Sequence, residues 1–284
     1  MTARVVLAVA MIGLAAPTVV RAQQPLPPYL KDRGTGVASS MFGTYIRKGD
    51  LIVYPYWEYY HDNNREYRPQ ELGYGLDQDF PGRYRESEYL FFLAFGITDF
   101  LAVQTELAGA KASLERSPAD PSGMPARIEE SGLTSFETQL RWRWARETER
   151  RPEVWSYLDV VYPINRDARI IGSDGWDVEL GLGLTRGFTW GTITARAAVF
   201  YESASPNIGP GEYAIEYLKR LSPSWRVFAA VQGAGSANEV SLITEVQWHI
   251  NRYVFIRLNQ EIGLTALATD WEPQLGVLFT LPTR

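Results

Sequence analysis

The sequence contains no cysteine among its 284 residues, so disulfide bonds and thiolate metal sites are excluded. Its 28 basic residues are outnumbered by 33 acidic ones, so it has no basic excess that would indicate a nucleic-acid partner. After residue 22 it also lacks any apolar run close to the roughly 20 residues that a membrane-spanning helix needs. If the chain crosses a membrane, it must therefore do so as a closed barrel, because every backbone amide in lipid has to be paired.

The first 22 residues predict a cleaved secretory signal peptide. Arg4 supplies the positive start, residues 5–20 are almost wholly apolar, and Ala22 is the small residue expected before cleavage at Gln23. The apolar run is shorter than a spanning helix and is interrupted by Pro17, which argues against an uncleaved anchor. We therefore divide the chain into a signal peptide (1–22), an N-terminal segment (23–50) and a barrel (51–284).

Residues 23–50 begin with Pro25, Pro27 and Pro28, which favour an extended start. We expect this segment to lie in the periplasm as a tail, because mobility concentrates at chain termini. The alternative is a plug, in which residues 39–46 enter the lumen of the barrel.

From residue 51 onward, apolar and polar residues alternate with period two, as in β-strands that have one apolar face. Short and long connections also alternate along the chain, and the long ones are rich in proline and glycine. This alternation is typical of outer-membrane barrels, which have short periplasmic turns, longer external loops and an even number of strands. Twelve strands are expected, near 51–60, 84–95, 100–112, 132–145, 154–163, 175–187, 191–202, 211–221, 225–234, 239–250, 253–264 and 271–281.

The predicted fold class is therefore all-β. We expect a single closed antiparallel transmembrane β-barrel of about 12 strands in the outer membrane of a Gram-negative bacterium, with the N- and C-termini periplasmic. A soluble β-sandwich has no reason to alternate short and long connections in this way.

Aromatic residues are abundant, with nine Trp, sixteen Tyr and twelve Phe. Many of them flank the predicted short turns, where amphipathic aromatic side chains favour a membrane interface. The alternative is that they are ordinary core aromatics. The predicted ring at this interface consists of Phe95, Phe100, Trp142, Trp144, Trp155, Phe188, Trp190, Trp225, Trp248, Tyr253 and Phe255.

The last predicted strand carries Gln274, Gly276, Phe279 and Leu281. These residues resemble the C-terminal signal by which the barrel-assembly machinery recognises its clients. The chain departs from that signal because residues 282–284 follow, whereas such proteins usually end on an aromatic residue. The resemblance implies the barrel-assembly machinery as a partner.

Stretches at 42–47, 140–144, 216–221 and 247–249 resemble a group of uncharacterised proteobacterial barrels. These barrels are grouped with the outer-membrane proteins of phenol meta-pathway (aromatic-degradation) operons. The likeness spans most of the mature chain and implies an outer-membrane barrel with a transport function. It brings no catalytic residues to this sequence.

If the apolar phase of each strand faces lipid, the opposite phase lines the lumen. Its acidic residues outnumber its arginines, which in an open pore favours cations; a salt-bridged, closed interior is the alternative. The phase includes Glu58, Asp177, Glu212 and Glu272. The predicted lumen-lining residues are Glu86, Glu88, Glu106, Glu137, Arg141, Arg143, Asp159, Glu179, Arg196, Glu216, Arg226, Glu245, Arg257 and Glu261.

Three functions stay open, and we favour a passive channel or transporter for small molecules, either cationic or aromatic and hydrophobic. The alternatives are an outer-membrane lipid hydrolase and a sealed structural barrel whose external loops bind a partner. We assign no catalytic residue, because the surroundings of His61 and Ser87 do not resemble the active-site motif of phospholipase barrels. We therefore expect no enzyme activity.

Acidic pairs in the external loops lack the spacing of a dedicated calcium site, so no metal or cofactor is predicted. The expected partners are outer-membrane lipid and lipopolysaccharide, the barrel-assembly machinery and a small-molecule solute, with no nucleic acid.

Overall fold

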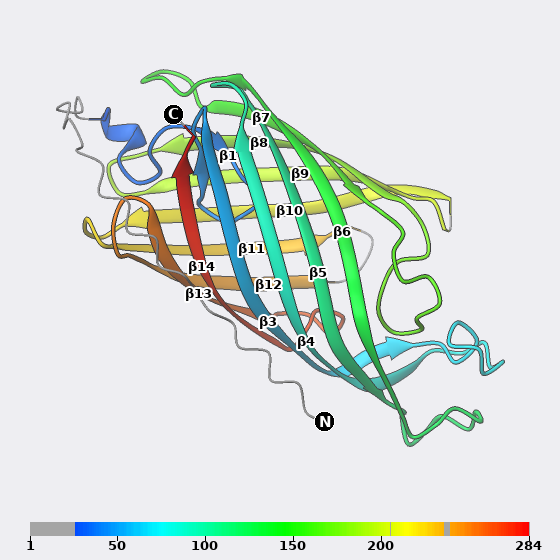
Figure 1. Cartoon of the computed structure of the whole chain (residues 1–284). Helices are drawn as coiled ribbons and strands as arrows, with labels where there is room; N and C mark the ends of the chain where they lie inside the picture. The colour runs from blue at the N-terminus through cyan, green and yellow to red at the C-terminus, as the bar shows by residue number, and fades with distance from the viewer. Residues whose placement is uncertain (1–25, 205, 236–238, 284) are drawn as a thin grey trace, which may run out of the picture.

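The computed structural model describes residues 26–204, 206–235 and 239–283, and the predicted signal peptide lies outside them. Strands β3 to β14 form a closed antiparallel barrel, in which each strand pairs with its neighbours in sequence and β14 pairs with β3 (Figure 1). The predicted all-β barrel is thereby confirmed. The strands are β3 (Asp50–Tyr67), β4 (Phe80–Gly96), β5 (Leu101–Glu115), β6 (Arg127–Ala145), β7 (Glu153–Val161), β8 (Asp177–Gly187), β9 (Thr192–Glu202), β10 (Asn207–Arg220), β11 (Trp225–Ala234), β12 (Glu239–His249), β13 (Val254–Gly263) and β14 (Trp271–Pro282).

Strands β3 to β6 are longer than the sequence indicated. β3 has 18 residues and β6 has 19, whereas a tilted strand crosses a bilayer with about 9–11 residues. The additional residues lie at the end that carries the long connections 68–79, 116–126 and 162–176. They extend beyond the part of the wall that needs an apolar face, so their sequences lack the alternation from which strands were predicted.

The outer face of the wall is apolar at mid-strand. On β8, Leu180, Leu182 and Leu184 are all more than half exposed, whereas the alternate positions Gly181 and Gly183 are buried. A side chain at Gly181 would overlap the Tyr157 ring, and one at Gly183 would overlap the Trp155 ring. The two glycines therefore make room for rings of β7 on the inner face, which agrees with crowding at a barrel wall.

The predicted aromatic ring is only partly correct. Trp144, Trp190, Trp225 and Trp248 are exposed beside short turns, and the last two stack with their centroids 6.1 Å apart. Trp155 and Phe255 were wrongly placed in this ring, since their side chains are 2% and 8% exposed on the inner face. The prediction considered only how close these residues lie to a turn, whereas the strand phase decides which face a side chain occupies.

The described ends of the chain lie at the end of the barrel that carries the short turns (Figure 1). There the Thr283 N–H donates to the Gly49 carbonyl at 2.9 Å. The N-terminal segment contains η1 (Pro28–Leu30), a single 3₁₀ turn, and a hairpin of β1 (Val37–Ala38) and β2 (Tyr45–Ile46). Among the residues that the structure describes, no helix is long and apolar enough to cross a membrane.

The hairpin of the N-terminal segment is deeply buried. Val37 and Ile46 pair across it, are fully buried, and pack in one apolar cluster with Tyr54 and Phe92 of the barrel wall. Gly36, with φ 135°, has a backbone conformation that residues with a side chain rarely adopt, and a Cβ there would clash with the backbone of Ile46. The hairpin is therefore packed against the inside of the wall.

Candidate functional site: the barrel lumen

The fourteen predicted lumen-lining residues are buried or half-buried. Apolar neighbours on the other strand phase, such as Leu140, Leu158 and Leu258, are exposed. The fourteen residues differ in the groups that they contact. By these contacts the lumen has three parts: an anchored N-terminal segment, a charged cavity and an acidic wall.

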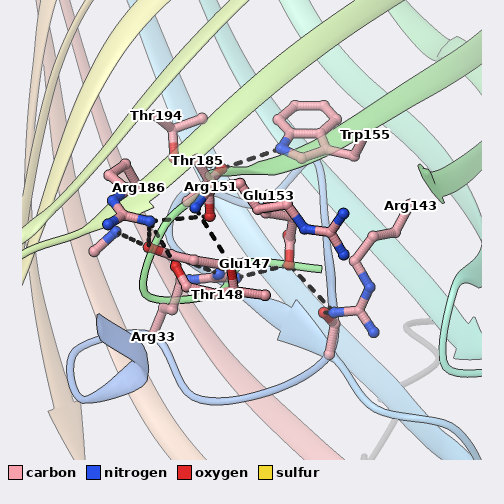
Figure 2. A network of polar contacts seen from close by, with 12 residues as sticks. Arg33, Arg143, Glu147, Thr148, Arg151, Glu153, Trp155, Thr185, Arg186 and Thr194 are labelled. Atoms are coloured by element: carbon pink, nitrogen blue, oxygen red, sulfur yellow. Dashed lines mark hydrogen bonds and ion pairs between the residues drawn. The ribbon is translucent and has the colours of Figure 1, made fainter. Parts of the chain in front are cut away.

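The N-terminal segment is anchored by ion pairs inside the barrel (Figure 2). Arg33 Nη2 lies 2.8 Å from Glu147 Oε2, and Arg33 Nη1 lies 3.2 Å from Glu153 Oε2. Glu153 also pairs with Arg143 at 3.3 Å, and Glu147 with Arg186 at 3.5 Å. One buried arginine thus connects the segment to β7 and to the short turn before it.

Arg33 stays charged in this setting. Burial by itself lowers the pKa of its guanidinium, but Tyr45, Glu153 and Glu147 raise that pKa above its ordinary value. The guanidinium also lies over the Tyr45 ring, 4.9 Å from its centroid. The ion pairs therefore persist at neutral pH.

Other contacts fix the segment to strands around the barrel, so it is held at several points of the circumference. On β10, the backbone N–H of Arg220 donates to Asp32 Oδ1 at 2.9 Å. On β5, Gln104 Oε1 accepts a hydrogen bond from Ser40 Oγ at 2.6 Å. On β11, the Phe228 ring stacks on the Phe42 ring with centroids 5.2 Å apart.

A cavity of about 210 Å³ lies between residues 38–45 of this segment and the inner faces of β6 to β11. Arg141, Trp155 and Tyr157 line it, together with Arg196 and Glu216 of β9 and β10. Six of the predicted lumen-lining residues border this cavity: Glu137, Arg141, Asp159, Glu179, Arg196 and Glu216.

The arginines of the lumen differ in their counter-ions. Arg196 lies 2.6 Å from Glu212 and 3.1 Å from Glu216, and Arg257 pairs with Glu245. Arg141, which is 3% exposed, has no carboxylate within 4.0 Å among the described residues. Its guanidinium instead lies about 5 Å from the ring centroids of Trp155 and Tyr157, its Nε donates to Gln139, and its Nη1 lies 3.5 Å from the Ala38 carbonyl oxygen.

The wall formed by β3, β4 and β5 is acidic. Glu58, Glu86, Glu88 and Glu106 are all buried there, and none has a lysine or arginine within 4.0 Å in the described part of the chain. Hydroxyl and amide donors hold them instead, and sequence reasoning missed these donors because strand phase places a carboxylate on a face without identifying the side chain that it meets. They are Tyr60 and Gln274 to Glu58, Tyr84 to Glu86, Thr134 to Glu88, and Tyr56 to Glu106.

The residues of the predicted assembly signal occupy both faces of β14. Gln274 donates to Glu58 on the inner face, and Gly276 lies against the stacked rings of Tyr54 and Tyr56. Phe279 and Leu281 are 36% and 47% exposed on the outer face. Recognition by the assembly machinery stays a prediction.

The serine and histidine considered for hydrolysis do not form a pair. The Ser87 hydroxyl accepts a hydrogen bond from Trp57 Nε1 at 2.8 Å, so its partner is an indole and not His61. Across residues 26–204, 206–235 and 239–283, no group of three or more His, Asp or Glu side chains is placed to hold a metal ion.

The fold is a closed barrel of twelve antiparallel strands. It is similar to the crystal structure of an outer membrane channel from Pseudomonas putida F1, with a TM-score of 0.61, 12% identity, and coverage of 86% of this chain and 100% of that one. It is also similar to the KdgM porin, with a TM-score of 0.52, 5% identity, and coverage of 81% of this chain and 99% of that one. No family model and no curated protein matches the sequence.

Proposed function

We propose that the protein is a passive outer-membrane channel for small solutes that prefers cations to anions. The observation that carries this proposal is the acidic wall of Glu58, Glu86, Glu88 and Glu106, which lacks basic partners in the described chain. Rings of carboxylates in a pore attract cations and exclude anions. The similar outer-membrane channel and the KdgM porin support the fold that such a function needs.

Three of the five predicted lumen arginines are held by partners of their own, away from the acidic wall. Arg196 and Arg257 are paired with carboxylates, and Arg143 is bound to Glu153 and to backbone carbonyls near the N-terminal segment. The charges of Arg196 and Arg257 are therefore neutralised locally, and Arg143 shares Glu153 with Arg33. A cation that enters from the long-loop end meets carboxylates held by hydrogen-bond donors.

Residues 26–49 serve as a plug in this proposal, in place of the free periplasmic tail that we expected. The support is the buried ion pair of Arg33 with Glu147 and the packing of Val37 and Ile46 inside the wall. The short turns and both termini face the periplasm in this arrangement, as they do in other outer-membrane barrels. Solutes would then pass beside the plug or when it loosens.

The test is the conductance of the refolded protein in a planar bilayer under a KCl gradient. Discrete current steps, with a reversal potential of the sign expected for potassium, would support a cation-preferring channel. Current steps with chloride preference would contradict the role of the acidic wall. The absence of steps in correctly folded protein would favour a sealed structural barrel.

A further inference from the structure

Among the charged residues that border the cavity beside the plug, Arg196 is paired with Glu212 and Glu216, whereas Arg141 and the acids Asp159 and Glu137 form no ion pair with one another. Arg141 lies near the hairpin, and Asp159 and Glu137 lie further from it on β7 and β6. In the register of these strands Asp159 is opposite Gln139, the next inward-facing position along β6 from Arg141. No ion pair within 4.0 Å joins Arg141 to either acid in the described chain.

Arg141 is a buried cation with an open hydrogen-bonding position. Two of its nitrogens are engaged, Nε by Gln139 and Nη1 by the Ala38 carbonyl, and its face is covered by the rings of Trp155 and Tyr157. Among the described residues Nη2 has no hydrogen-bond partner, and the side chain borders the cavity. Buried guanidinium groups are usually matched by a carboxylate, often with two parallel hydrogen bonds.

The acidic side of the cavity is also incomplete. Asp159 Oδ1 is buried and has no hydrogen-bond partner among the described residues. Glu137 borders the same space, and no basic group lies within 4.0 Å of it there. Buried carboxylates, like buried cations, are costly unless something pairs with them.

Arg141 on one hand and the acids Asp159 and Glu137 on the other favour one class of ligand. A simple anion at Arg141 would lie next to Asp159 and Glu137, and a simple cation at those acids would lie next to Arg141. A molecule that carries both charges satisfies all three groups. The volume of about 210 Å³ is far above the roughly 10–15 Å³ that holds one water molecule, so a small organic solute fits.

We propose that this cavity is a binding site for a small zwitterion with one carboxylate and one ammonium group, as in a short amino acid. The carboxylate binds Arg141 through Nη2, and the ammonium group binds Asp159 with Glu137 beside it. This inference rests on the proposed function in that the solute reaches the lumen from outside. With such a site, the channel would prefer zwitterionic solutes and bind them weakly.

The test uses calorimetric titration of the refolded full chain with three probes of equal carbon number: β-alanine, propionate and propylammonium. β-Alanine is expected to bind at least tenfold more tightly than either singly charged probe. Arg141→Gln and Asp159→Asn are each expected to weaken β-alanine binding at least tenfold, and Arg141→Lys to weaken it less than Arg141→Gln. Arg83→Gln, an exposed arginine outside the cavity, serves as the control and should leave binding unchanged.

Equal binding of propionate, or of propylammonium, would overturn the proposal in favour of a plain anion or cation site. So would unchanged β-alanine binding in both Arg141→Gln and Asp159→Asn, once each variant is shown to be folded. Conductance of the same preparation separates this result from the proposed function. Conductance without β-alanine binding overturns the inference alone, whereas binding without conductance supports the inference and contradicts the channel.

Discussion

Arg33 Nη2 lies 2.8 Å from Glu147 Oε2 inside the barrel, and both side chains are at most 1% exposed. The two residues are 114 positions apart in the sequence, so no local pattern relates them. Their pairing fixes a proline-rich segment, whose composition is typical of a free tail, to the short turn between β6 and β7. In the proposed channel, this buried ion pair is what holds the plug in the lumen.

Replacing Arg33 by glutamine is expected to loosen the plug. Removing one partner of a buried ion pair costs about 3–5 kcal/mol, although Arg186 and Arg143 will continue to pair with the two carboxylates. Single-channel recording should show longer or larger open states in Arg33→Gln. Lys31→Gln removes an exposed positive charge from the same segment and should behave like the unaltered protein. Identical recordings from all three proteins would contradict the plug.

The lipid-facing phase can be tested at Leu182. Leu182→Arg puts a charge on the apolar outer face and should reduce the free energy of unfolding by about 2–4 kcal/mol. Gly183 is an unsuitable lumen control, because any side chain there overlaps the Trp155 ring. Gln232, which borders the cavity on β11, is the better one, and Gln232→Arg should avoid the lipid penalty. Urea unfolding from lipid vesicles measures both, and equal losses would contradict the phase assignment.

Much of the barrel wall could be predicted from the sequence, because contact with lipid makes apolar and polar residues alternate with a period of two along each strand. The phase of Leu182 and of the lumen glutamates follows from that constraint. The inward position of Trp155 does not, since it depends on the space left by Gly183 on the next strand. The burial of Val37 and the hydrogen bond from Gln274 to Glu58 do not follow from the period of two either. Both are contacts between segments far apart in the sequence, and no sequence pattern relates those segments.

Cation preference should depend on the acidic wall. The double variant Glu58→Gln, Glu106→Gln removes two negative charges while it keeps oxygen acceptors for Tyr60 and Tyr56. Because surface potentials of charged clefts amount to several kT, the permeability ratio of potassium to chloride should fall by roughly a factor of two or more. Reversal potentials under a KCl gradient provide the measurement. Glu149→Gln, an exposed acid in a short turn, is the control, and an equal fall there would refute a specific role of the wall.

The packing of rings over glycines makes a prediction about stability. Gly183→Ala places a methyl group where the Trp155 ring lies, so the ring must shift and its hydrogen bond from Nε1 to Thr185 Oγ1, 3.1 Å long, will be strained. Overpacking of this kind typically costs about 1–3 kcal/mol. Gly123→Ala is the matched control, because a Cβ at Gly123 meets nothing within 4 Å, and its effect should stay within about 0.5 kcal/mol. Urea unfolding measures both variants; a loss at Gly183 no larger than that at Gly123 would mean that Trp155 does not occupy the space that the glycine leaves.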